Sequence, residues 1–393
     1  MSGGFLRGPR AAVTAVAVML FASTGAAAVP AAAQSNTLVL AVVAPFTGDE
    51  AAEGQNAKEG AEAAAAQINS AGGIGGKQVQ LQYEDDRGDP KEAANIAQKL
   101  VGQKSRIFAV IGHTDSSPTL AALPIYSQAG MPVLNNSSSN PKITQLGYQN
   151  FIRMVQPDDN QAKQMVAFAV NNLKKSNIGI FFGNSDYGRG VRDYQVPIIQ
   201  QLGVQQADEE SFTPNQDKDF SSQLTKMVST SPDAVMLNTV YTEGGLVLRQ
   251  AQTAGLTDVV WIGPDSNLYD DYINLSGGAA EGTYVLAAFD PFASSPKTVA
   301  LVQQFQSQYK TLPSEVAVFT YDIVFLVQSA VGQGASQDTL ISTIKGMTFD
   351  GAGGTYQWDS KGDVGGKPLA VIQVQDGKFA STGQTVDLTG LSS

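Results

Sequence analysis

The chain has 393 residues, and its 25 basic and 36 acidic residues give a net charge of −11. This balance argues against nucleic acid and anionic membrane surfaces as partners. The sequence has no cysteine, which excludes disulfides, thiol nucleophiles and cysteine-based metal sites, so the hydrophobic core must supply the stability.

Residues 1–33 are typical of a secretory signal peptide. Arg7 and Arg10 form its basic beginning, residues 11–28 form an apolar stretch without acidic residues, and small residues end the segment before Gln34. The alternative interpretation, a membrane anchor, is disfavoured because polar residues interrupt the apolar stretch. We therefore expect export and cleavage.

The mature protein is expected to be free in an exported compartment, most simply a bacterial periplasm. No cysteine is present to carry a lipid, and no later run is apolar and long enough to span a membrane. Removal of residues 1–33 takes away Arg7 and Arg10, which leaves 23 basic and 36 acidic residues and a net charge of −13. The remaining roughly 360 residues are enough for two domains.

The first half of the chain alternates strand-like and helix-like segments. Residues 37–45 are apolar and β-branched, as in a buried strand, and residues 54–69 are rich in alanine and end at glycines, as in a helix. Further strands are predicted at 78–83, 106–111 and 132–134, and further helices at 90–101 and 118–129. The order βαβαβαβ predicts a parallel, doubly wound domain.

The same pattern restarts in the second half, which predicts a second α/β unit. Its helices are predicted at 162–173, 190–201 and 243–254, and its strands at 177–182, 234–238 and 259–262. Later segments belong to one of the two units: a strand at 282–288, helices at 296–309 and 319–333, and β-structure at 354–358 and 369–374.

Two serine-rich turns follow the predicted strands 106–111 and 132–134. Ser116 and Ser117 precede a proline in the first, and residues 135–140 precede a proline in the second. Serine or asparagine before proline is typical of an N-cap and the first helical residue. Such turns direct backbone N–H groups and hydroxyls at one spot, which suits a carboxylate. Ligands of open α/β sheets lie at these strand ends, so both turns could face one ligand.

The alternative interpretation of these turns is that they only begin helices. Capping explains one serine, but it explains neither the adjacent serine nor the second polar turn. Asp265 follows the predicted strand 259–262 and could bind an ammonium group, although alone it would be read as an Asx turn. Together, the turns and Asp265 predict a clamp for both halves of a zwitterion.

Signals for an enzyme are weak. No Gly-x-Ser-x-Gly motif occurs, the glycine-rich segment 72–77 lacks phosphate-loop spacing, and the acidic residues after 264 lack calcium-loop spacing. A secreted serine hydrolase using Ser116 and His113, the only histidine, is a remote alternative, because no third group is predicted to orient the histidine. We predict no catalysis, no cofactor and no metal.

Further motifs accompany the serine turns in a fixed order: APFTG at 44–48, INSAGGIGG at 68–76, EDD at 84–86, FIR at 151–153, YGRG at 187–190, LRQA at 248–251 and AEG at 280–282. This ordered set, over about residues 38–379, resembles the periplasmic branched-chain amino acid (Leu/Ile/Val-type) binding proteins of ABC transporters. The resemblance implies the type I periplasmic-binding fold, with two doubly wound parallel-sheet lobes.

The resemblance also implies that three hinge crossovers join the lobes, near residues 156–157, 287–290 and 349–354. The first lobe would comprise 34–156 and 289–350, and the second lobe 157–288 and 351–393. The late helices would thus return to the first lobe, and the β-rich tail to the second.

The family's ligand residues carry over through this resemblance. Ser116 matches the serine that holds the ligand carboxylate, and Ser137 and Ser139 match the second turn, which contacts both carboxylate and amine. Asp265 matches the acidic residue on the amine, with Asp in place of the commoner Glu. Tyr187 matches an aromatic residue that lines the cleft, although from the residues alone it could equally pack within its loop.

Two positions depart from the family pattern. Glu53 stands where an aromatic residue is expected, and Val240, with Tyr241 beside it, stands where a tyrosine is expected. Asn135 and Asn136 are also more polar than usual. These departures imply that the contacts with the ligand's carboxylate and amine are kept, while the pocket for the ligand's side chain is altered. A polar or acidic amino acid or a short amide is therefore a plausible ligand.

The resemblance implies a soluble receptor that closes two lobes on an amino acid and delivers it to an ABC permease. A monomer is expected, as is usual for this fold. The alternative is a ligand sensor of the same fold, for an amide, urea or aromatic acid, that acts on a signalling partner. The identity of the ligand is left open.

Overall fold

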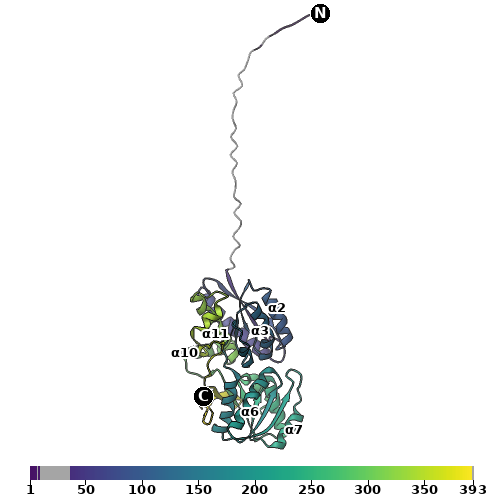
Figure 1. Ribbon diagram of the computed structural model, residues 1–393, viewed down its shortest axis with the longest axis vertical. Helices are drawn as coiled ribbons and strands as arrows, with labels where there is room; N and C mark the ends of the chain where they lie inside the picture. Colours follow the sequence, from purple (N-terminus) through teal and green to yellow (C-terminus); the bar gives the residue numbers. More distant parts are fainter. Residues whose placement is uncertain (7, 9–35, 392–393) are drawn as a thin grey trace. The chain divides into compact units, whose positions relative to one another are not determined.

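The computed structural model describes residues 1–6, 8 and 36–391. Residues 36–391 form the folded unit that is shown with some of its helices labelled in Figure 1. The apolar stretch and the cleavage site of the predicted signal peptide lie outside the described residues, so the signal peptide stays a prediction.

The first sheet is entirely parallel and, within residues 36–391, has five strands in the order β2-β1-β3-β4-β5. These strands are β1 Thr37–Ala44, β2 Gln78–Asp85, β3 Ile107–Gly112, β4 Val133–Asn135 and β5 Phe151–Arg153. Side chains of β1 alternate between two hydrophobic clusters, with Leu40 in one and Ala41 in the other. Both faces of the strand are buried, which explains why its sequence is apolar throughout.

Helices cover both faces of this sheet. They are α1 Ala51–Ser70, α2 Pro90–Val101, α3 Ser116–Gln128, α4 Lys142–Gln145, α10 Pro296–Gln308, α11 Glu315–Gly332 and α12 Leu340–Lys345. Residues of α1 and α11 pack on one face, and residues of α2 and α3 pack on the other (Figure 1). The late helices α10 to α12 therefore belong to the first lobe, as the resemblance implied.

Helix α11 corrects one expectation. Among the described residues it is long and apolar enough to cross a membrane, with a mean hydropathy of 1.4, whereas we expected no such run. It packs against α1 in the core of the first lobe, and 67% of it is buried. Its apolar character is therefore that of a core helix.

The second sheet has the order β14-β13-β10-β9-β8-β6-β7 in the described chain. Its strands are β6 Asn177–Gly183, β7 Gln205–Phe212, β8 Ala234–Asn238, β9 Val260–Pro264, β10 Tyr284–Ala287, β13 Ala370–Gln375 and β14 Lys378–Ser381. The strands from β10 to β7 pair in parallel, whereas β13 and β14 add an antiparallel edge from the tail. The predicted fold of two α/β lobes is confirmed, with this antiparallel edge as a difference from a purely parallel sheet.

The helices of the second lobe likewise cover two faces. They are α5 Asp158–Ala167, which continues as a π-helix over Phe168–Asn172, α6 Asp186–Gln201, α7 Ser221–Thr230, α8 Tyr241–Ala254, the 3₁₀-helix Asp265–Asn267 and α9 Asp270–Ser276. Strand β7 and helix α7 were not predicted. Strand β7 is an edge strand whose polar residues are only partly buried, so its hydrophobic pattern is weak.

A small hairpin of β11 Thr348–Gly351 and β12 Gly354–Gln357 follows α12. Tyr356, Trp358 and Val364 pack in the same cluster as β1 and α11. The lobe boundaries remain a prediction, and this packing favours a third crossover after Val364 instead of near residue 350.

Candidate functional site

Hydrogen bonds join the two lobes where the carboxyl ends of both sets of parallel strands face one another. The Tyr241 hydroxyl donates to the Asp49 carbonyl at 3.0 Å, and the Ser117 hydroxyl donates to Asp186 Oδ2 at 2.9 Å. At the exposed edge, Lys218 Nζ lies 2.5 Å from Asp49 Oδ2. The lobes are therefore in contact around an enclosed cleft.

The first serine turn begins α3 earlier than predicted. Asp115 is the N-cap residue, and Ser116 and Ser117 are the first two helical residues, whereas we predicted that Ser117 caps the helix before Pro118. The amides of a first helical turn have no partner within the helix. Ser116 is buried, and its Oγ accepts the Asn140 N–H at 3.3 Å, which leaves the hydroxyl proton to donate to a ligand.

Ser117 points across the cleft instead of into it. Its hydroxyl donates to the Asp186 carboxylate and accepts the Asp186 N–H at 3.1 Å. These two bonds occupy the hydroxyl, so its contacts are those of a link between α3 and α6.

The side chain of Asn135 fixes the backbone of the second serine turn. Asn135 Oδ1 accepts the N–H groups of Ser137 at 3.1 Å and of Ser138 at 2.7 Å. The Ser137 hydroxyl donates to Glu315 Oε1 at 3.3 Å. The Ser139 carbonyl accepts the Asp158 N–H at 3.0 Å, which joins the turn to the second lobe.

Asn135 and Asn136 are fully buried, and their side chains serve the fold. Asn135 Nδ2 donates to the His113 carbonyl at 2.7 Å and so ties the two serine turns together. Asn136 Nδ2 donates to Thr320 Oγ1 of α11 at 2.9 Å. The polarity that we attributed to the ligand pocket is therefore explained by the packing of the turn at Asn135, whereas Asn136 Oδ1 is buried without a partner in the described chain.

Asp265 begins the 3₁₀-helix after β9 and is buried. The Tyr187 hydroxyl lies 3.1 Å from Ser266 Oγ, so the tyrosine and Asp265 sit on the same side of the cleft. Tyr187 is the second residue of α6, whose N-cap Ser185 accepts the Gly188 N–H at 3.2 Å. The expectation of a loop over residues 184–190 was wrong, because this serine cap starts the helix at Asp186.

The positions that depart from the family pattern flank the same cleft. Glu53 lies in the first turn of α1 with only 3% of its surface exposed, and Val240 is the N-cap residue of α8. The Tyr241 ring contacts the Tyr269 ring in a tilted arrangement with centroids 4.6 Å apart, and the Tyr241 hydroxyl accepts the Ala52 N–H at 3.2 Å. Tyr241 therefore contacts the first lobe directly.

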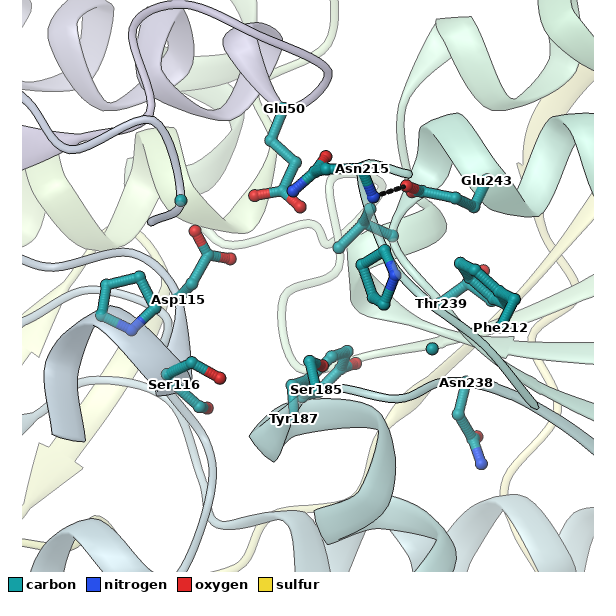
Figure 2. Close-up of a pocket in the computed structure, with 16 residues that line it drawn as sticks. Glu50, Asp115, Ser116, Ser185, Tyr187, Phe212, Asn215, Asn238, Thr239 and Glu243 are labelled. Atoms are coloured by element: carbon teal, nitrogen blue, oxygen red, sulfur yellow. Dashed lines mark hydrogen bonds between the residues drawn. The ribbon is translucent and has the colours of Figure 1, made fainter. Parts of the chain in front are cut away.

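Figure 2 shows a cavity between the lobes, with a volume of about 70 Å³. Four predicted site residues line it, namely Ser116, Ser117, Tyr187 and Val240. The five others are not among its lining residues: Ser137, Ser139, Asp265, Glu53 and Tyr241.

Three carboxylates that we did not predict line this cavity: Glu50, Asp115 and Glu243 (Figure 2). Glu50 and Asp115 point toward one another, and after burial the charge of Asp115 helps to raise the pKa of Glu50 well above its ordinary value. Burial, followed by the charge of Asp86, raises the pKa of Asp115 to about 7. Glu243 Oε1 accepts the Asn215 N–H at 3.2 Å, whereas its buried Oε2 has no donor among the described residues.

A second carboxyl pair crosses the cleft. Glu315, the first residue of α11 in the first lobe, lies close enough to Asp265 of the second lobe for the charge of Asp265 to act on it, and its Oε1 accepts the Ser137 hydroxyl at 3.3 Å. Burial and the charge of Asp265 raise the pKa of Glu315 well above its ordinary value. Burial and the charges of Asp115, Asp265 and Glu243 do the same to Glu53. The spacing in the sequence gave no signal for Glu315, because it lies 50 residues after Asp265.

His113 is buried and does not pair with Ser116. Its Nδ1 lies 2.6 Å from Asp86 Oδ2, and its Nε2 lies 3.2 Å from the Tyr126 hydroxyl. We expected no group to orient this histidine, and Asp86 corrects that expectation. Because the Nε2 faces Tyr126, the geometry lacks the Ser116–His113 pair that the hydrolase alternative needs.

The fold and the enclosed interlobe cleft define a two-lobed α/β solute receptor. Residues 37–378 match the family described as periplasmic binding protein. The chain is 30% identical over 354 residues to the leucine-, isoleucine-, valine-, threonine-, and alanine-binding protein of Pseudomonas aeruginosa, covering 89% of this chain and 91% of that one. It is 29% identical over 347 residues to Leu/Ile/Val-binding protein homolog 3 of Brucella melitensis, covering 87% and 92%.

Solved structures of amino acid binding proteins have the same fold as this chain. A leucine binding protein from Thermotoga maritima has a TM-score of 0.82 at 28% identity and is covered over 99% of its length, with 89% of this chain. A branched-chain amino acid transporter substrate binding protein from Streptococcus pneumoniae, in complex with isoleucine, also has a TM-score of 0.82, at 26% identity, covering 88% of this chain and 98% of that one. The chain belongs to the periplasmic binding protein family, which places it in the periplasm.

Proposed function

We propose that the chain is the solute receptor of an ABC transporter, which captures an amino acid between its two lobes and delivers it to a membrane permease. The observation that carries this proposal is the enclosed cleft between the lobes, where Ser116 and Asp265 supply a free hydroxyl proton and a buried carboxylate. Relatives with the same fold are named for amino acids that they bind, and one solved structure holds isoleucine.

Within this proposal, Ser116 and the second serine turn hold the ligand carboxylate, and Asp265 holds its ammonium. Tyr187 lines the cleft beside Asp265. Ser117 and Tyr241 hold the closed lobes together, since their hydroxyls already have partners in the opposite lobe. Ligand binding stabilises the closed form, which is the form that the permease would recognise.

Isothermal titration calorimetry of the mature chain against the twenty amino acids tests this proposal. We expect saturable binding of at least one of them. Binding of none, with circular dichroism confirming a folded protein, would refute the amino acid receptor.

A sensor that reports to a signalling partner stays a second candidate, because a closed cleft serves either role. Uptake of the bound amino acid by cells with and without this gene separates the two roles. Loss of uptake on deletion supports transport, and unchanged uptake supports sensing. We further propose a binding role without catalysis, cleavage of residues 1–33 on export, and a monomer in solution, which sedimentation velocity and the mass of the exported chain would test.

A further inference from the structure

The cleft is far more acidic than capture of a simple zwitterion requires. Asp265 alone can neutralise one α-ammonium group, yet Glu53, Glu315 and Glu243 are also buried there, with 3%, 4% and 0% of their surfaces exposed. Lysine, arginine and histidine are absent from the described residues that line the cavity of Figure 2. Lys218 is the nearest cation to Glu243, at 4.0 Å, and it is engaged by Asp49 at the exposed edge.

Orphaned oxygen atoms show that this set of acids lacks its partner. Glu243 lines the cavity, and its buried Oε2 has no hydrogen-bond donor; the buried Glu315 Oε2 likewise has none in residues 36–391. A buried carboxylate without a partner is strongly unfavourable. A cation that enters the cleft would supply the missing donors and the missing charge.

The acids divide into two places along the cleft. Asp265 and Glu315 pair beside the second serine turn, since Ser137 also bonds Glu315. Glu53 follows Ala52 in the first turn of α1, where the Ala52 N–H donates to the Tyr241 hydroxyl of the second lobe, and the charges of Asp115, Asp265 and Glu243 all act on it. Two separated positions therefore exist for positive charge.

Two further observations favour an organic cation. No group of three or more acidic or histidine side chains within the described residues has a geometry that could hold a metal ion. The rings of Tyr241 and Tyr269, which are tilted by 30° with centroids 4.6 Å apart, lie near enough to Glu53 for its charge to raise the pKa of both phenols, after burial. Aromatic faces beside a carboxylate suit the methylenes and the charged head of a long cationic side chain.

We propose that the cleft selects an amino acid whose side chain carries a second positive charge, of the lysine, ornithine or arginine type. The inference rests on the proposed function as an amino acid receptor. The α-ammonium group lies between Asp265 and Glu315, and the side-chain cation lies against Glu53, toward Asp115 and Glu243. This assignment replaces the sequence-based expectation of a polar, acidic or amide ligand.

Matched ligands test the proposal by calorimetry on the mature chain. L-lysine is compared with L-norleucine, which replaces the ammonium by a methyl group, and L-arginine is compared with neutral L-citrulline. We expect lysine or arginine to bind about 10- to 100-fold more tightly than its neutral partner, the usual range for a hydrogen bond to a charged group. Equal or tighter binding of norleucine or leucine would overturn this inference and leave the amino acid receptor standing. Binding of no amino acid would refute the proposed function itself.

Two variants distinguish the position of the α-ammonium group from the position of the side-chain cation. Glu53→Gln should bring the lysine-to-norleucine ratio close to 1, whereas Glu315→Gln should weaken lysine and norleucine alike. Asp338→Asn, which removes a charge whose side chain is 82% exposed, should change neither. A Glu53→Gln protein that keeps the full ratio would contradict the assignment of Glu53.

A measurement on the unaltered protein guards against variants that do not fold. Lysine binding should release protons from the raised-pKa carboxyl groups of the cleft, and norleucine should release fewer. Titrations in buffers of different ionisation enthalpy measure this difference. Equal proton release by the two ligands would count against a side-chain cation among the carboxylates.

Discussion

The edge and the interior of the cleft differ in whether their charged groups have partners within the chain. At the edge, every charged or polar group that crosses between the lobes has a partner of this chain: Lys218 pairs with Asp49, and Ser117 bonds Asp186. In the interior, Glu243 and Glu315 each leave one carboxylate oxygen without a hydrogen-bond donor in the described chain. The edge can therefore close without a ligand, whereas the interior lacks the positive charge that its carboxylates require.

Arg153, a buried cation outside the cleft, shows how a buried charge is paired in this protein. Arg153 has no exposed surface, yet its guanidinium bonds Asp363 at 2.6 Å and the carbonyls of Ser138 and Asn140 at 3.1 Å each. Asp322, also buried, accepts the N–H groups of Ala352 and Gly353. These two buried charges have partners within the chain, and Glu243 and Glu315 differ from them in this respect.

The largest effect is expected from Arg153→Met. It leaves Asp363 and two carbonyls of the second serine turn without their donor, and breaking a buried pair typically costs about 3–5 kcal/mol. The free energy of unfolding, measured by urea denaturation, should fall by that amount. Arg189→Met, which alters a partly exposed ion pair on α6, is the control and should change it by less than about 1 kcal/mol. A loss as small as the control's would show that Arg153 does not organise the turn.

Ser116→Ala should weaken ligand binding by about 1–3 kcal/mol, since a buried charged partner loses its donor. Calorimetry with L-lysine and L-leucine as probes measures the change, and the thermal midpoint should be nearly unaffected. Ser127→Ala, at the far end of α3, is the matched control. Unchanged affinity in Ser116→Ala would remove this serine from the site.

The pH should shift the balance between open and closed forms of the unliganded protein. Glu53 and Glu315 have raised pKa values in the closed form, from burial and then from neighbouring carboxylates of both lobes, Asp115, Asp265 and Glu243. In an open form water would return them toward 4.5, so closure takes up protons and falling pH favours it. Each proton taken up changes the closed-to-open ratio by at most about tenfold per pH unit.

Small-angle X-ray scattering of the unliganded protein between pH 8 and pH 5 measures this balance through the radius of gyration. We expect the radius to shrink as the pH falls, and a smaller shift in Glu315→Gln. A radius that grows on acidification would contradict the sign of this linkage.

Ser117→Ala removes one hydrogen-bonded link at the edge. A typical intramolecular hydrogen bond contributes about 0.5–1.5 kcal/mol, so the closed form should lose that much stability while ligand contacts stay intact. Faster ligand dissociation with a nearly unchanged association rate, measured by stopped-flow fluorescence, is the expected result. A change confined to association would place Ser117 in ligand recognition instead.

The smallest effect is expected from Lys218→Met. Its ion pair with Asp49 is exposed, and such pairs contribute about 0–1 kcal/mol. Affinity at 0.5 M salt should therefore match that of the unaltered protein. A larger effect at low salt would show that Lys218 also balances the charge of Glu243.

The sequence predicted the elements whose signals are local. The apolar run of β1 and the Asp89–Pro90 start of α2 were both located to within a residue, because burial on two faces and an N-cap leave their mark in adjacent positions. The starts of α3 and α6 were misplaced, since Asp115 and Ser185 cap these helices before the predicted starts at residues 118 and 190. Strand β7 was missed because an edge strand needs little apolar surface.

By itself, the sequence determined the alternation of buried strands and helices, the two serine turns, and the unusual acid at Glu53. Only the tertiary structure decided which charges meet. Glu50, Asp115, Glu243 and Glu315 come from four distant segments, and each is unremarkable in its own segment. Hydrophobic periodicity is a local property of a chain. The electrostatic field in a cleft depends instead on which ends of distant helices the two lobes bring together.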